Sequence, residues 1–379
     1  MTSNELFSAL AEKDIICWGE GKHFRNITYP FLCRSGLVEN LCGFVDGPGA
    51  KKVCIGGKSF PKYNKSALAG MNHEKTVLLI TVTGYLEILA QIKDSPYISD
   101  IISIPSIYLE ALYEDQMMLD APKPPVHYRK HSKQMIPKII HTFWFSDQEE
   151  ISLPPRYRAC LESWKKYAPD YEIKIWTLQS YMAKECLFFR QAVEEKMWAF
   201  ATDYARADVL RRYGGVYMDL DVEMLRPIDD LLTNDAYMSF ESLDRIECGS
   251  GMGAVKGNRI LEEICESYEE RPFIKEDGSM DLSTCPVRFT KVIEKHGLVK
   301  NGGFQEVEDI TIYPFEVLTG KSFDTGIVYR TELSYTLHHH KGSWVPGTAK
   351  DAMERRYREI DGFLQSLRKA GDISSLIVL

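Results

Sequence analysis

Tyr213-Gly-Gly-Val-Tyr-Met-Asp-Leu-Asp221 closely follows Ala201-Thr-Asp-Tyr-Ala-Arg206, and these two stretches together decide how the fold is interpreted. Residues 213–221 predict a Gly-Gly turn followed by a short apolar strand. Side chains at positions i and i+2 of a strand share a face, so Asp219 and Asp221 are expected on one side of it. Two carboxylates on one face can share a hard divalent cation, and an added imidazole favours Mn²⁺ over Mg²⁺. This pattern predicts a metal site.

Asp203 and Arg206 lie three residues apart on a helix expected over residues 199–212, so they share a helical face. They could form an ordinary intrahelical ion pair worth a few tenths of a kcal/mol. Alternatively, the acid could hold sugar hydroxyls while the guanidinium neutralises a phosphate. A metal can also hold a pyrophosphate through its oxygens. Together these groups predict a nucleotide-sugar site.

Length, charge and cysteine usage limit the class of protein. A chain of 379 residues is long enough for two domains, and a net charge of −8 argues against a nucleic-acid surface. Nine scattered cysteines without a C-x-x-C pair, and a start without a signal-peptide pattern, predict reduced thiols in a cytoplasmic protein. The most apolar run, residues 76–90, is too short to span a bilayer.

Residues 121–135 are rich in proline and basic side chains, which predicts a linker between a domain over 1–120 and another over 136–379. The linker could be merely solvated, or it could touch lipid phosphates. The basic amphipathic helix that begins near residue 349 is counted with the second domain. It could pack on that domain or dock at the inner membrane face, so peripheral membrane contact stays open.

The first domain is predicted to be a small Rossmann-like α/β unit. Strands are expected over residues 14–18, 41–46 and 76–82, and Gly19-Glu-Gly21 follows the first of them. Phe24 stands where the dinucleotide fingerprint has its third glycine, so the ligand of this domain is left open. The region resembles the small Rossmann-like domains at the N-terminus of bacterial surface-polysaccharide enzymes.

The second domain alternates strand and helix patterns, which predicts an α/β fold with a mostly parallel sheet. Residues 136–145 and 171–176 are expected as strands, with a helix over 157–167 between them. Ligands in such folds bind beyond the carboxyl ends of the strands. Trp144 and the Asp219/Asp221 pair both fit that position.

A histidine run, Leu337-His-His-His-Lys-Gly-Ser-Trp344, is expected to form a loop that closes over the donor. An imidazole could bind the metal, and His339 and His340 are the expected ligands, although spacing alone does not decide among the three histidines. The acceptor side is expected at the glycine-rich segment between the two motifs, where ordinary turns are the alternative. Its candidate residues are Glu241, Asp244 and Gly251.

Four blocks in a fixed order resemble a known family. They are Ile139-Ile-His-Thr-Phe-Trp144, the two opening stretches, and His339-His340 followed by Ser343-Trp344. The combination is similar to the DXD-containing glycosyltransferases, which include an initiating mannosyltransferase of yeast and many bacterial capsular and lipopolysaccharide transferases, with a distant likeness to clostridial toxins. The resemblance implies a GT-A fold, a nucleotide-sugar donor, a divalent metal and retention of anomeric configuration.

The resemblance also implies roles for single residues. Trp144 would stack on the nucleotide base, Asp221 would bind the metal directly, and Asp219 would contact ribose or sugar and reach the metal through water. Lys341-Gly342 replaces the aromatic residue usual after the histidine pair. The remaining donor-site residues are expected to be His141, Asp203, Arg206, Tyr217, Ser343 and Trp344.

The function expected from these features is glycosyl transfer in surface-polysaccharide synthesis, from UDP-hexose or UDP-N-acetylhexosamine to a glycan or lipid-linked glycan. A GDP-mannose-dependent mannosyltransferase is the alternative within the class. A toxin-like protein glycosyltransferase is disfavoured by the missing secretion signal. A catalytically silent binding module is disfavoured by the intact aspartates and arginine.

Overall fold

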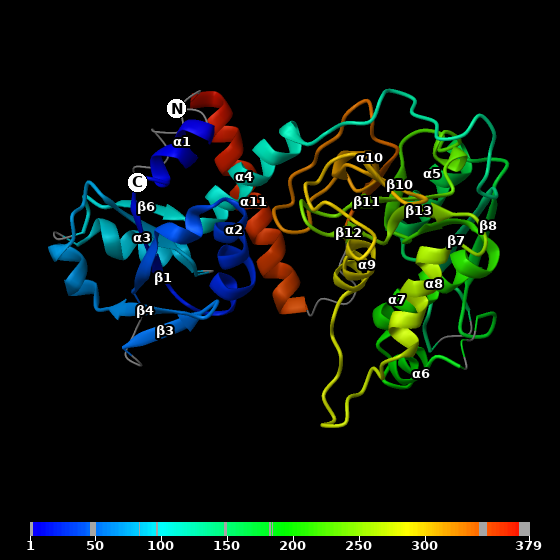
Figure 1. Cartoon of the computed structure of the whole chain (residues 1–379), viewed down its shortest axis with the longest axis horizontal. Helices are drawn as coiled ribbons and strands as arrows, with labels where there is room; N and C mark the ends of the chain where they lie inside the picture. The colour runs from blue at the N-terminus through cyan, green and yellow to red at the C-terminus, as the bar shows by residue number, and fades with distance from the viewer. Residues whose placement is uncertain are drawn as a thin grey trace. The chain divides into compact units, whose positions relative to one another are not determined.

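The structure is a computed structural model that describes residues 3–45, 51–82, 84–95, 98–147, 150–181, 183, 185–340 and 347–370. Figure 1 follows the chain from the N-terminus in blue to the C-terminus in red. The chain forms two compact units. Unit 1 comprises Met1–Gln116 with Arg355–Leu379, and unit 2 comprises Met117–Glu354.

Unit 1 is built on a six-stranded sheet in the order β3-β4-β2-β1-β5-β6. The central strand β1 pairs in parallel with β2 on one side and β5 on the other, as in a doubly wound fold. This confirms the α/β class predicted for the N-terminal part. The strands are β1 (Asp14–Trp18), β2 (Leu41–Val45), β3 (Lys52–Ile55), β4 (Lys58–Tyr63), β5 (Thr76–Ile80) and β6 (Ile102–Pro105).

The glycine after β1 has a steric reason. Gly19 has φ +108°, and a Cβ there would lie 2.4 Å from the Val82 side chain. The helices of this unit include α1 (Ser3–Leu10), α2 (Tyr29–Arg34), α3 (Tyr85–Lys93) and most of α4 (Ser106–Asp120). Residue 46, the last of the expected second strand, lies outside the described residues.

The C-terminal helix α11 (Gly347–Ala370) belongs with unit 1 from Arg355 onward, which corrects its expected place in the second domain. Its apolar side is used within that unit, because Ile360 and Leu364 are buried. Phe363 stacks on Tyr108 with ring centroids 4.1 Å apart. Sequence periodicity shows that such a helix has an apolar side, but it does not say which surface that side covers.

Residues 121–135 are part of unit 2, and several of their basic side chains pair with acids of that unit. Arg129 lies 2.6 Å from an Asp230 oxygen, and His131 lies 2.9 Å from Asp235. The Pro122 carbonyl accepts a hydrogen bond from the Phe304 N–H at 2.7 Å. The basic side chains that suggested lipid contact therefore face acids of the same unit.

Unit 2 contains an eight-stranded mixed sheet in the order β14-β15-β11-β13-β9-β7-β8, with β12 paired to β11, and a two-stranded sheet of β10 and β16. β7 pairs in parallel with β8 and β9, whereas β13 runs antiparallel to both β9 and β11. The α/β class is confirmed, but a mostly parallel sheet was a wrong prediction. The short connections from β11 through β12 to β13 allow only antiparallel pairing, because parallel pairing needs a long crossover.

The strands of unit 2 supply the framework of the site, and Figure 1 labels β7, β10 and β13 among them. Their bounds are β7 (Ile139–Phe143), β8 (Glu172–Trp176), β9 (Gly215–Met218), β10 (Val222–Met224), β11 (Ala236–Phe240), β12 (Ile246–Glu247), β13 (Ser250–Ala254), β14 (Gln305–Val307), β15 (Ile310–Tyr313) and β16 (Thr336–His338).

Two hydrophobic cores cover the two faces of this sheet. On β9, Tyr217 joins one core, while Val216 and Met218 join the other, as alternation along a strand requires. Trp164 is fully buried in the second core and donates a hydrogen bond to the Val222 carbonyl at 2.7 Å. The helices are α5 (Pro155–Tyr167), α6 (Leu187–Glu194), α7 (Trp198–Tyr213), α8 (Arg259–Glu269), α9 (Cys285–Glu294) and α10 (Phe315–Leu318).

Among the described residues, no helix combines the length and the apolar character that crossing a bilayer requires.

Candidate active site

A cavity of about 540 Å³ lies in unit 2 beyond the carboxyl ends of β7 and β9. Trp144 immediately follows β7, and Asp219 immediately follows β9, and both line the cavity. The two strands are parallel neighbours, so the residues after them emerge at the same edge of the sheet. The sequence predicts the ligand at this same edge of the sheet.

The two aspartates come together in a turn and not on a strand. β9 ends at Met218, and the Val222 N–H donates to the Asp219 carbonyl at 3.0 Å, which closes the turn that contains Asp221. The expected strand geometry for the pair was wrong, because the chain reverses direction to begin β10. Gly249 lies against this turn, and a Cβ on it would be 2.1 Å from an Asp219 carboxylate oxygen.

Asp203 and Arg206 share a face of α7, as their spacing predicts, and their side chains lie 3.1 Å apart. Both line the cavity although each is only 7% exposed. Arg206 also approaches Asp219 at 3.7 Å. Burial raises the pKa of Asp203 to about 6, although the charge of Arg206 acts in the opposite direction. The pair therefore connects α7 to the turn after β9.

Tyr217 joins the same network from β9. Its hydroxyl donates a hydrogen bond to Asp219, and the Arg206 guanidinium lies over its ring, 5.0 Å from the centroid. Burial raises the pKa of Asp219, with Arg206 and His338 acting against the rise and Asp221 adding to it. A second positive charge near these carboxylates would stabilise their ionised forms.

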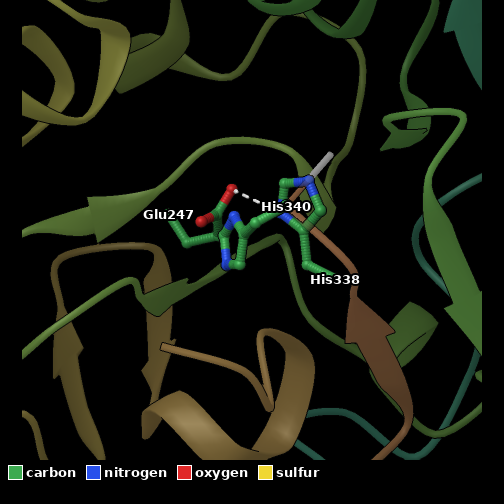
Figure 2. Close-up of side chains that lie close together, drawn as sticks. All are labelled: Glu247, His338 and His340. Atoms are coloured by element: carbon green, nitrogen blue, oxygen red, sulfur yellow. Dashed lines mark ion pairs between the residues drawn. The ribbon is translucent and has the colours of Figure 1, made fainter. Parts of the chain in front are cut away.

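The three histidines separate by strand alternation. His338 ends β16, which pairs antiparallel with β10, and its Nε2 lies 3.2 Å from an Asp221 oxygen. His340 lies beside it with ring centroids 4.0 Å apart, and Figure 2 shows both imidazoles next to Glu247. His339 faces the other way, 3.1 Å from Glu223.

The sequence predicted His339 and His340 as the histidines at the metal. The structure places His338, and not His339, beside the aspartates, so the prediction of His339 is corrected. The side chains of His338 and His339 point to opposite faces, and His340, with φ +48°, lies beside His338. His338 is the histidine at the aspartates.

Two overlapping groups of side chains could hold a cation, each with its ligand atoms within 4.8 Å of one another. One group is Asp219, Asp221 and His338, and the other is Glu247, His338 and His340. The buried Nε2 of His340 has no hydrogen-bond partner among the described residues. Carboxylate oxygens with imidazole nitrogen form a donor set that suits Mn²⁺ and related divalent ions.

His141 has a structural position instead of the expected donor contact. It is completely buried, accepts a hydrogen bond from the Trp176 indole at 3.1 Å and donates one to the Gly214 carbonyl at 2.9 Å. One ring nitrogen therefore bonds to Gly214 in the turn before β9, and the other bonds to Trp176 at the end of β8. Burial lowers the pKa of His141 to about 4.

Of the three expected acceptor-side residues, Glu241 lines the cavity and the other two do not. Glu241 lines the cavity and lies 3.4 Å from Arg245. Burial raises the pKa of Glu241 to about 8, against the opposing charge of Arg245. Asp244 and Gly251 are not among the residues that line the cavity. Ser343 and Trp344 lie outside the described residues.

Sequence reasoning missed several residues that line the cavity. They come from segments far apart in the chain, and no local spacing connects them to the aspartates. His338 is one of them, because the side of the histidine run that meets the aspartates depends on the pairing of β16 with β10. The others are Arg156, Arg245, Phe323 and Asp324, while Glu247 was noted only within its glycine-rich segment.

Comparisons with known proteins indicate a glycosyltransferase. Residues 154–238 match the family described as the glycosyltransferase sugar-binding region containing a DXD motif. Inositol phosphoceramide mannosyltransferase 3 of Schizosaccharomyces pombe is 27% identical over 185 residues, which cover 47% of this chain and 45% of that protein. Mannosyl phosphorylinositol ceramide synthase SUR1 of Saccharomyces cerevisiae is 29% identical over 133 residues, which cover 34% and 32%. The chain thus spans less than half the length of these curated relatives.

Among solved structures, one titled PaToxG Glycosyltransferase superposes with a TM-score of 0.34 at 17% identity, covering 50% of this chain and 77% of that one. A TM-score this low supports no conclusion about fold or function, so the likeness to glycosyltransferases rests on the sequence matches. The matched region contains Asp203, Arg206, Asp219 and Asp221, the residues that meet at the cavity. Residues 154–238 of this chain are therefore similar to the glycosyltransferase sugar-binding region that contains a DXD motif.

Proposed function

We propose that this chain transfers a hexose from a nucleoside-diphosphate sugar to a hydroxyl group of a glycan or lipid-linked glycan. The observation that carries the proposal is the meeting of the Asp203–Arg206 pair with Asp219, Asp221 and His338 at one cavity. Such a cavity offers a cation site, a guanidinium and a carboxylate to one ligand. A nucleotide sugar has the matching diphosphate and hydroxyl groups.

A divalent cation fits the donor set, and Asp219, Asp221 and His338 would hold it. When bound, it would neutralise the charge that develops on the departing diphosphate. Arg206, 3.7 Å from Asp219, adds a fixed positive charge at the same place. Asp203 orients that guanidinium and offers carboxylate oxygen to sugar hydroxyls.

We propose that the transfer retains the anomeric configuration. The acceptor oxygen forms its bond to the anomeric carbon on the face that the diphosphate leaves, and the acceptor proton passes to the diphosphate. No nucleophile from the chain is needed for this step.

The names of the relatives favour a mannosyl donor, because both refer to mannosyl transfer. GDP-mannose is therefore the first candidate, and UDP-hexose and UDP-N-acetylhexosamine are the second. The same names refer to an inositol phosphoceramide acceptor, which supports a lipid-borne acceptor more than a polysaccharide.

Release of nucleoside diphosphate from a panel of GDP- and UDP-sugars, with Mn²⁺ and with EDTA, tests this proposal. Many transferases hydrolyse their donor slowly without acceptor, so the acceptor need not be known. Metal-dependent release from one donor is expected. If no donor is hydrolysed or bound by the wild-type chain, the proposal is wrong.

A further inference from the structure

His338 presents its two ring nitrogens to two different groups. Nε2 faces the aspartates, 3.2 Å from Asp221 and 3.9 Å from Asp219. Nδ1 lies 3.1 Å from the Ser250 hydroxyl oxygen and 3.6 Å from a Glu247 carboxylate oxygen. The buried ring therefore stands between the aspartates and Glu247.

Glu247 is fixed in place by its own backbone. It lies on β12 and is buried, and one carboxylate oxygen accepts hydrogen bonds from the N–H groups of Cys248 at 3.0 Å and Gly249 at 2.5 Å. The same oxygen faces His338, and Figure 2 marks this ion pair with a dashed line. Since two backbone donors already hold this oxygen, its position behind the imidazole is set before any ligand arrives.

His340 restricts the same imidazole from the side. The two rings are nearly parallel, with an interplanar angle of 30° and centroids 4.0 Å apart. With Glu247 and Ser250 at Nδ1 and His340 against its face, His338 has little freedom to turn Nε2 away from Asp221.

This arrangement resembles that of metal-binding histidines, with the Ser250 hydroxyl at hydrogen-bond distance from Nδ1 and the Glu247 carboxylate at ion-pair distance. Their second ring nitrogen usually donates to a carboxylate, which fixes the tautomer and makes the ligating nitrogen more basic. We propose that Glu247 is a positioning residue that holds His338 with Nε2 directed at a cation shared with Asp219 and Asp221. The proposal rests on the cation site of the proposed function, and it adds the residue that sets the affinity of that site.

Mn²⁺ binding to the full chain without donor tests the proposal. Electron paramagnetic resonance of free Mn²⁺ gives the affinity and stoichiometry, and pulsed measurements detect nitrogen bound directly to the ion. The wild-type chain is expected to bind one Mn²⁺ with coupling to a single nitrogen, which His338→Gln abolishes. Glu247→Gln is expected to keep the nitrogen coupling while weakening Mn²⁺ binding by about 10- to 100-fold.

Glu223→Gln is the matched control, because Glu223 forms the same kind of pair with His339, 3.1 Å apart, on the opposite face of β10 and β16. Its Mn²⁺ affinity should equal that of the wild type. Far-ultraviolet circular dichroism and thermal melting separate a loss of affinity from a loss of fold.

Three results would overturn the proposal. Wild-type affinity in Glu247→Gln would show that Glu247 does not act on the site. Two nitrogens on the ion, or a second Mn²⁺ per chain, would make Glu247 and His340 direct ligands. Absence of Mn²⁺ binding in the wild type would remove the cation itself. Because no donor is present, these results are independent of whether the chain hydrolyses a nucleotide sugar.

Discussion

At the scale of single residues, a contact set by local helix geometry could be predicted from the sequence, whereas a contact set by strand pairing could not. Asp203 and Arg206 lie on one helical turn, so their 3.1 Å contact follows from spacing alone. Whether His338 or His339 faces Asp221 depends on which strand pairs with β16, and that partner lies more than a hundred residues earlier in the chain. The sequence therefore predicts histidines near the aspartates, but it does not identify His338 as the one beside Asp221.

Trp144 gives a prediction at this scale. It is half-buried, lines the cavity, and lies edge-on to Tyr157 with ring centroids 6.0 Å apart. Trp144→Ala should raise the KM for the donor by roughly tenfold or more, because stacking of a base on an aromatic ring contributes about 1–3 kcal/mol. Trp144→Phe, which keeps a ring, should change KM less. Steady-state kinetics measure both, and an unchanged KM in Trp144→Ala would remove this residue from the donor site.

His141 gives a pH-dependent prediction. Its pKa is lowered from 6.5 to about 4 in the folded chain, so below pH 6.5 the unfolded chain takes up a proton that the folded chain refuses. Stability from this residue is lost as the pH falls from about 6.5 towards 4, by about 2 kcal/mol at pH 5. His141→Gln lacks this loss, so its deficit in the free energy of unfolding should shrink by that amount between pH 7.5 and 5. Urea denaturation at both pH values measures it, and a constant deficit would contradict the assignment.

At the scale of elements, the sequence identified the strands that carry the site better than it identified their pairing. β7 and β9 were expected and found, because continuous apolar runs bounded by glycine and proline are local signals. The antiparallel strand β13 in the middle of the sheet was not expected, since pairing depends on connections and not on the strand itself. This strand matters because the segment from Glu247 to Gly249, just before it, adjoins the aspartates.

Gly249→Ala tests the contact between this segment and the turn after β9. The added methyl group would lie 2.1 Å from an Asp219 oxygen, so Asp219 or the backbone must move. Donor turnover should fall by roughly tenfold or more, while the fold is retained. Gly362→Ala, where nothing lies within 4 Å, is the control and should keep wild-type turnover. Equal rates for both variants would show that this close approach is unimportant.

At the scale of the whole molecule, the order of segments along the chain does not show which unit each segment belongs to. Unit 1 is made of the first 116 residues and a C-terminal helix that returns to it, whereas residues 121–135 belong to unit 2. Amphipathic periodicity and charge predict that a segment will be covered or exposed, but not by which partner. The α/β class of both units was accessible from the sequence, and the return of α11 was not.

Ile360→Ala tests this membership. Ile360 is 1% exposed in unit 1, so the substitution should cost about 2–5 kcal/mol of the stability of that unit. Calorimetric unfolding measures this loss as a fall in transition temperature. The transition that falls should be the one that Mn²⁺ with nucleoside diphosphate does not stabilise, because the proposed ligand site lies in unit 2. A shift confined to the ligand-stabilised transition would contradict the assignment of α11.

We propose that the cavity of unit 2 binds a nucleoside diphosphate through a cation held by the aspartates after β9. Isothermal titration of GDP and of UDP into the full chain, with Mn²⁺ and with EDTA, tests it directly. One of the two nucleotides should bind with Mn²⁺ and fail to bind with EDTA, and Asp221→Asn should lose that binding while Asp147→Asn, an exposed carboxylate in an ion pair with Lys196, keeps it. Binding that is equal with Mn²⁺ and EDTA, or no binding of either nucleotide to the wild type, would contradict it.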